Sequence, residues 1–184
     1  MPTVYRVGLN VDDYQSVLES GDGGFPIRNR FDGRPIGSAW NPPECYIQNP
    51  KLKRPDFWSC FAVWFWFAVT KECAHKIVTF LDQSCETLPL PVEDSGELLF
   101  CNVTEVVNCL DKKQSEAKPY PGTYKKYVFH PDRWNFSLFK IPETAPWEVL
   151  CVEGVTDPND EFKGTVERLG LTGIKFQKLW SDES

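Results

Sequence analysis

The sequence predicts an α+β protein with a mixed or mainly antiparallel sheet and two or three helices. Short apolar runs bounded by Gly, Pro, Asn and Asp recur along the chain and indicate strands. Two segments, 70–83 and 157–169, instead combine helical spacing of apolar residues with helix-capping signals. A chain of 184 residues is long enough for one sizeable core or for two small cores that share an interface. We therefore expect two subdomains, 1–95 and 96–184, that share an interface.

The first subdomain begins with a predicted strand over residues 3–9 and continues into a loop-rich stretch from Gly21 to Pro55. That stretch holds five glycines and six prolines, which interrupt regular structure too often for long helices or strands. We expect it to wrap the core as ordered loop.

Residues 57–69, FWSCFAVWFWFAV, form the most apolar part of the chain. A run of 13 residues is shorter than the roughly 20 that a membrane-spanning helix needs. Because seven of the 13 are Phe or Trp and a turn signal precedes them, the run predicts a buried strand. The alternative is an exposed aromatic face on which a partner docks.

A helix is predicted to follow the aromatic strand directly, over residues 70–83. Thr70 is suited to cap it, and its apolar residues recur at helical spacing. Short strands are expected at 87–92 and 97–103, joined by the turn-rich Glu93-Asp94-Ser95-Gly96. The predicted subdomain boundary lies at this connection, near residue 95.

The second subdomain is predicted to contain strands at 124–129, 138–141 and 149–152. The helix at 157–169 has Asp157 as its expected N-cap, Pro158 at its first position and Gly170 at its end. A final strand is predicted over residues 174–180.

Seven cysteines are spread along the chain, and none has Cys-x-x-Cys spacing. The first residues have neither the charged nor the apolar region of a secretion signal. We therefore expect reduced, mostly buried thiols in a cytoplasmic protein.

The sequence predicts no catalytic, cofactor-binding or metal-binding residues. The two histidines, His75 and His130, belong to no recognisable nucleophile motif, and the cysteines lack the paired spacing of a zinc site. A nucleophile assembled from distant segments stays open as an alternative.

The net charge of −6 argues against binding to nucleic acid or to an anionic membrane. The charge is unevenly distributed, since residues 143–161 contain six acidic side chains and no basic one. We interpret this block as a solvated acidic face or as a surface for a basic protein partner. The candidate interface residues are Glu143, Glu148, Glu153, Asp157, Asp160 and Glu161.

Several Gly, Pro and aromatic motifs together resemble immunity protein family eleven of bacterial polymorphic toxin systems. They are Gly24-Phe25-Pro26, Phe31-x-Gly33-x-Pro35-Ile36-Gly37-x-x-Trp40, Val69-Thr70, Leu88-Pro89, Leu110-Asp111-x-x-x-Ser115, Tyr127-Val128-Phe129, Leu138-Phe139-x-Ile141 and Gly170-Leu171-Thr172-Gly173-x-x-Phe176. The resemblance extends from about residue 22 to 180, and its last motif is the most specific. The chain departs from the pattern at Thr70-Lys71, where the family favours Ser-Asp.

The resemblance implies a non-enzymatic antidote that binds the toxin encoded beside it in the cytoplasm. It implies no catalytic residues and no cofactor, and it makes Gly170 and Gly173 architectural positions. Two hypotheses from other classes remain: a small enzyme with a Cys or carboxylate nucleophile, and an adaptor that docks through its aromatic segment.

Overall fold

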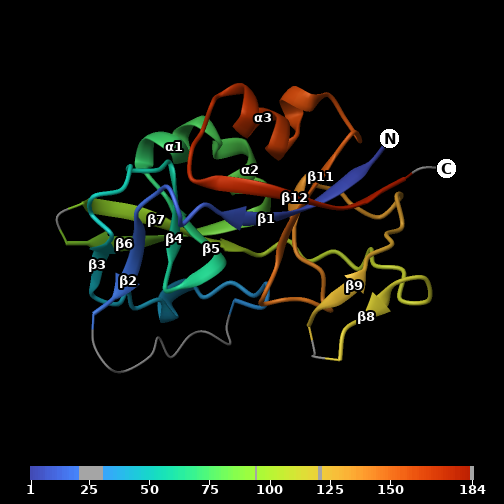
Figure 1. The fold of residues 1–184 in the computed structure, drawn as a ribbon, viewed down its shortest axis with the longest axis horizontal. Coiled ribbons are helices and arrows are strands. Elements are labelled where there is room, and N and C mark those ends of the chain that lie inside the picture. Colours follow the sequence, from blue (N-terminus) through green and yellow to red (C-terminus); the bar gives the residue numbers. More distant parts are fainter. Residues whose placement is uncertain (21–30, 94, 120–121, 183–184) are drawn as a thin grey trace.

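The computed structural model describes residues 1–20, 31–93, 95–119 and 122–182. Within them the chain forms the predicted α+β fold, with a mixed sheet, an antiparallel sheet and three α-helices (Figure 1). None of the helices in these ranges is long and apolar enough to cross a membrane.

The mixed sheet has six strands in the order β3-β2-β4-β5-β7-β6. Its strands are β2 (Ser16–Glu19), β3 (Cys45–Gln48), β4 (Phe57–Cys60), β5 (Val63–Val69), β6 (Cys85–Val92) and β7 (Gly96–Val103). Among the described strands of this sheet, β2 and β4 pair in parallel and the other neighbouring strands pair antiparallel. The sheet curls so that its edge strands β3 and β6 meet, and the Glu93 N–H donates to the Cys45 carbonyl at 2.9 Å. The curled sheet encloses an aromatic core that includes Phe31, Trp58 and Trp66.

The second sheet is antiparallel, with the strand order β10-β11-β1-β12. It consists of β1 (Thr3–Leu9), β10 (Leu138–Phe139), β11 (Val149–Glu153) and β12 (Ile174–Ser181). The small pair β8 (Glu116–Ala117) and β9 (Tyr124–Lys126) lies apart from both sheets at the lower right of Figure 1.

The helices α1 (Lys71–Lys76), α2 (Val78–Ser84) and α3 (Phe162–Arg168) gather on one side of the molecule (Figure 1). Two short 3-10 turns, η2 (Gly37–Ala39) and η3 (Pro158–Asp160), complete the elements of the described chain. The helices bury Phe80, Phe162 and Val166 in a core that also receives side chains from β1, β5, β7 and β11. This shared core joins the two sheets.

The aromatic run differs from its prediction because it forms a hairpin, β4 and β5, in place of one strand. Phe61 and Ala62 turn the chain with φ of 59° and 57°, the left-handed conformation that tight hairpins use. Neither Phe nor Ala favours such a turn, so the hairpin could not be predicted from the local sequence. Trp58 and Trp66 are buried and Phe65 is half-buried, so these side chains belong mainly to the core.

Both predicted helices are interrupted. Thr70 caps α1 as expected, since its hydroxyl accepts a hydrogen bond from the Cys73 N–H at 3.1 Å, but the backbone leaves the helical conformation at Ile77 before α2 begins. Asp157 caps the turn η3, and the extended residue Glu161 separates that turn from α3. The second helix therefore begins at Phe162, four residues after its predicted first position at Pro158.

The strands predicted at 3–9, 87–92, 97–103, 149–152 and 174–180 are present, with ends that differ by at most two residues. Those predicted at 124–129 and 138–141 are shorter, because β9 ends at Lys126 and β10 at Phe139. The loop-rich stretch contains η2 and β3, and its residues 21–30, with the motif Gly24-Phe25-Pro26, lie outside the described chain.

The predicted boundary near residue 95 does not coincide with the division between the sheets. It falls in the turn of the β6–β7 hairpin, whose strands pair along their whole length. Strand β1 also leaves its sequence neighbours and pairs with β11 and β12 from the other end of the chain. Non-local pairing of this kind leaves no local signal in a sequence.

The Gly-Leu-Thr-Gly motif connects the two sheets, and its role is architectural as predicted. The Thr172 N–H and hydroxyl both donate to the Asp56 carboxylate at 2.8 Å. Gly173 has a φ of +89° and packs so closely that an added Cβ would lie 2.2 Å from the Phe57 carbonyl oxygen. The backbone therefore requires glycine at this position.

Candidate functional site

A groove of about 770 Å³ lies beside β1 and β12, bounded by Phe65 of β5 and by Lys118 and Thr123 at the β8–β9 pair. On these strands, Arg6, Gly8 and Gln177 line it. The small Gly8 leaves space between the larger side chains, so the antiparallel pairing of β1 with β12 shapes the groove.

The polar wall of the groove is a hydrogen-bonded network around the buried carboxylate of Glu148, which is 4% exposed. Arg6 Nε donates to Glu148 Oε1 at 2.8 Å, and the Tyr127 hydroxyl donates to Oε2 at 2.8 Å. Arg6 Nη1 also donates to Gln177 Oε1 at 2.7 Å. The network therefore connects β1, β12 and the segments of Tyr127 and Glu148.

Electrostatics keep the donors of this network, Arg6 and Tyr127, protonated. Burial, and then the negative charge of Glu148, raise the pKa of the Tyr127 hydroxyl above its ordinary value. Burial by itself would lower the pKa of Arg6, but Glu148 and Tyr127 outweigh that effect and raise it. Glu148 thus accepts from fixed donors, an arrangement that suits a structural carboxylate better than a proton-transfer group.

The apolar wall and the rim of the groove have a different character. Phe65 is half-buried at its surface, and Leu9 is buried beneath. At the rim, Lys175 Nζ lies 3.4 Å from Asp12 Oδ2. Apolar surface surrounded by charged groups is typical of a surface that binds another protein.

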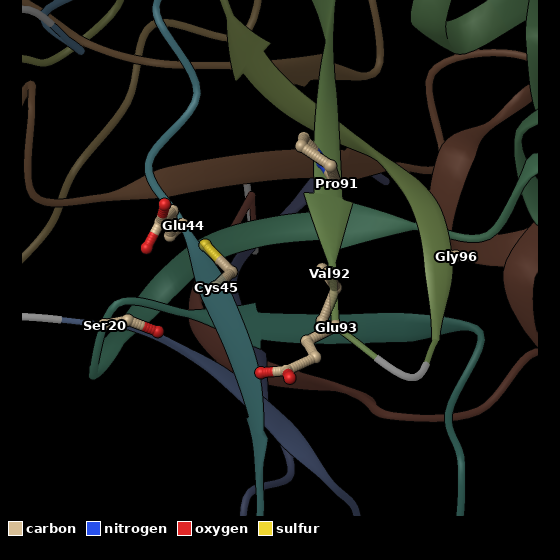
Figure 2. A pocket seen from close by; sticks show the side chains of 7 residues that line it. All are labelled: Ser20, Glu44, Cys45, Pro91, Val92, Glu93 and Gly96. Carbon is tan, nitrogen blue, oxygen red and sulfur yellow. The ribbon is translucent and has the colours of Figure 1, made fainter.

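A second hollow, of about 530 Å³, opens where β3 meets β6. Figure 2 shows the Cys45 thiol there together with the carboxylates of Glu44 and Glu93. This pocket is the natural place to look for the Cys-dependent enzyme. However, burial and the nearby Glu19 raise the pKa of the Cys45 thiol to about 12, so it stays protonated at neutral pH. A protonated thiol is a weak nucleophile.

Neither histidine activates a cysteine. His75 is exposed on α1 and His130 is half-buried, and no hydrogen bond joins either imidazole to a thiol or a hydroxyl in the described ranges. The seven cysteines are free, and six of them are buried, as predicted. The described residues also contain no cluster of three acidic, His or Cys side chains arranged for a metal.

The six predicted interface carboxylates do not form one exposed face. Glu148 lies in the network described above, and Glu161 is only 1% exposed. Glu161 accepts the N–H groups of Gly154, Val155 and Thr156 at 2.9, 2.7 and 2.8 Å. The acidic block therefore contains two carboxylates with internal structural roles.

Two more of the six are held in ion pairs. Glu143 Oε1 lies 2.7 Å from Lys112 Nζ, and Glu153 Oε1 lies 3.2 Å from Lys163 Nζ. Of the six, Asp157 and Asp160 are exposed, and Asp157 caps η3. The interpretation of the block as one exposed acidic face is contradicted by the burial of Glu148 and Glu161, because sequence spacing does not show which carboxylates turn inward. Contact of the other four carboxylates with a partner stays a prediction.

The groove residues on β1 and β12 were missed by sequence reasoning. Arg6, Gly8 and Gln177 come from opposite ends of the chain and belong to no motif. The polar positions Lys175 and Gln177, which alternate with Ile174 and Phe176, carry the one usable signal, that of a strand with a solvent-facing side.

Comparison with models of known protein families and with curated proteins finds no match to this chain. The resemblance to immunity protein family eleven therefore stays a prediction based on the motifs quoted above.

Proposed function

We propose that this protein is a non-catalytic antidote, an immunity protein that binds a toxin domain in the cytoplasm and blocks its active site. The observation that carries the proposal is the groove beside β12, which has one apolar wall, one polar wall and a charged rim. Such a surface binds a protein partner through a few buried contacts, while the charged rim selects that partner.

Two further observations support this function over the alternatives. The raised pKa of the Cys45 thiol disfavours a Cys nucleophile in the pocket of Figure 2. The burial of Trp58 and Trp66 disfavours an adaptor that docks through these two tryptophans. The motif resemblance favours an antidote among proteins that bind other proteins.

The direct test is co-expression of this protein with the toxin domain encoded beside its gene. We expect cells to grow when both are present and to die when the toxin is expressed alone. Equal killing with and without this protein would refute the proposed function.

A matched pair of variants tests whether the groove is the contact surface. Phe65→Asp places a charge on the apolar wall, whereas Val78→Asp places one on exposed α2, away from the groove. We expect Phe65→Asp to lose protection while Val78→Asp keeps it, with circular dichroism showing that both fold. Loss of protection in both variants, or in neither, would place the contact elsewhere.

Asp157 and Asp160, the exposed members of the acidic block, are the residues best placed to meet a basic partner. If this region also contacts the toxin, the double variant Asp157→Lys/Asp160→Lys will slow association at low salt and have less effect at high salt. Unchanged association rates would confine the contact to the groove.

A further inference from the structure

Strand β12 is an open edge of the antiparallel sheet in the described chain. The Asn10 N–H donates to the Gly173 carbonyl at 2.9 Å, which fixes the alternation of hydrogen bonds along the β1–β12 pair. By that alternation Lys175 and Gln177 bond to β1, and the N–H and C=O groups of Ile174, Phe176 and Lys178 point away from the sheet. Among the described residues, no backbone hydrogen bond occupies these outward groups.

Hollows flank this edge on both faces. The 770 Å³ groove lies on one face, and a hollow of about 420 Å³ between α3 and β12 lies on the other. Both hollows include Lys175 and Phe176 in their lining, so β12 separates them. A strand added to β12 would direct its side chains alternately into the two hollows.

The edge is locally basic. Lys175 and Lys178 lie on β12, and Lys118 lies across the groove from it. Lys118 and Lys178 are exposed and form no ion pair with the described residues, whereas Lys175 faces Asp12. An incoming segment therefore meets more positive than negative charge.

We propose that β12 captures an extended, acidic segment of the partner protein, which adds to the sheet as a fifth strand beside Ile174–Lys178. The inference deepens the proposed function and rests on it for the existence of a protein partner. Outward backbone groups supply the hydrogen bonds, the two hollows receive alternate side chains, and the three lysines select acidic residues.

The same charges disfavour a second copy of this chain as the occupant. Pairing two copies of β12 would bring two sets of Lys175 and Lys178 to one seam. Lysines and β-bulges both protect sheet edges from self-association. The β1–β12 pair has such a bulge, where the register shifts between Val4 and Tyr5. This bulge lies beyond the proposed binding segment, Ile174–Lys178.

The experiment uses the full chain and an eight-residue peptide in which Val and Glu alternate. We expect the peptide to bind and to slow hydrogen exchange at the amides of Ile174, Phe176 and Lys178. A peptide with Lys in place of Glu should bind at least about tenfold more weakly because of the lysines. A peptide with every backbone nitrogen methylated should not bind measurably, because it has no N–H groups to donate.

A protein variant provides the complementary control. Lys178→Pro removes one outward N–H, and proline is tolerated at such a position on an edge strand. We expect it to bind the acidic peptide about tenfold more weakly than Lys178→Ala, which loses the same charge but keeps the N–H. Urea unfolding of both variants shows whether the fold is retained.

Three results would overturn the inference: no binding of the acidic peptide, binding without slower exchange on β12, or equal binding by the two Lys178 variants. A concentration-dependent dimer that protects the same amides would assign the edge to a second copy and would also overturn it. These outcomes are independent of the co-expression test. Protection from the toxin without peptide binding would preserve the antidote function and reject the strand-addition mode.

Discussion

Among single residues, the buried carboxylates of segment 143–161 show that a run of acidic residues in the sequence does not have to form an acidic surface. Glu161 is 1% exposed and accepts three backbone N–H groups that would otherwise lack partners. Asp160, its neighbour in the sequence, is exposed and accepts no hydrogen bond through its side chain from the described residues. The two residues have the same charge and different functions.

This difference is measurable as stability. Replacing Glu161 with Ala leaves three donors unsatisfied, so we expect the free energy of unfolding to fall by about 2–4 kcal/mol. Asp160→Ala should change it by no more than about 0.5 kcal/mol. Urea unfolding of the two variants makes the comparison, and equal effects would contradict the structural role of Glu161.

At the scale of elements, the Gly-Leu-Thr-Gly turn holds the two sheets together through close backbone packing. Gly173 and Gly96 both have positive φ, at +89° and +78°, but their surroundings differ. A Cβ at Gly96 meets no atom within 4 Å, whereas one at Gly173 would collide with the Phe57 carbonyl. Comparing alanine variants at Gly173 and Gly96 therefore separates the cost of a left-handed backbone from the cost of a steric overlap.

We expect Gly96→Ala to lower the free energy of unfolding by about 1–2 kcal/mol, the cost of a left-handed non-glycine residue. Gly173→Ala carries that cost and a steric overlap, so its loss should exceed that of Gly96→Ala by at least about 2 kcal/mol. Denaturant unfolding at a single pH compares them. Similar losses would mean that the turn can shift to admit a side chain.

The sequence predicted those elements whose signals are local. Alternating apolar residues located the strands, Thr70 capped its helix, and the Gly-rich motif was rightly interpreted as architecture. The turn at Phe61-Ala62 escaped prediction because its residues do not favour the left-handed conformation that packing imposes on them. The groove escaped because Arg6 and Gln177 meet only through the pairing of the first strand with the last.

At the scale of the whole molecule, the cysteines link stability to pH. Burial raises the pKa of all the thiols, and it does so to about 12 for Cys45, Cys73, Cys85 and Cys109. An ordinary thiol in the unfolded chain has a pKa near 8.5. The folded protein keeps its protons where the unfolded chain releases them, so the stabilisation is complete below about pH 8.5 and is lost as pH rises toward 12.

One buried lysine acts in the opposite direction. Burial lowers the pKa of Lys140 to about 8, while its Nζ donates to the Phe31 carbonyl at 2.6 Å. The unfolded chain keeps this lysine protonated up to about pH 10.4, whereas the folded protein releases the proton near pH 8. Titration of Lys140 therefore increases stability as pH rises from about 8 to 10.4. Because one lysine raises stability over this range while seven cysteines lower it, the free energy of unfolding still decreases at alkaline pH.

We expect the free energy of unfolding to fall by at least about 3 kcal/mol between pH 8 and pH 10 under reducing conditions. Urea titrations at several pH values measure this slope. The Cys109→Ala variant should show a shallower slope because it lacks one of the thiols. A stability that is flat or rises over this range would contradict the buried, protonated state of the cysteines.

In the described chain, two sheets share a core, and β12 forms an open edge of the antiparallel sheet. The proposed binding site for the toxin domain is β12. Hydrogen exchange of the backbone amides, measured in the free protein and in its complex with the toxin domain, shows where the contact lies. We expect slower exchange at Ile174, Phe176 and Lys178 in the complex, with unchanged exchange on the exposed face of α2. Unchanged exchange along β12 in a stable complex would refute this binding site.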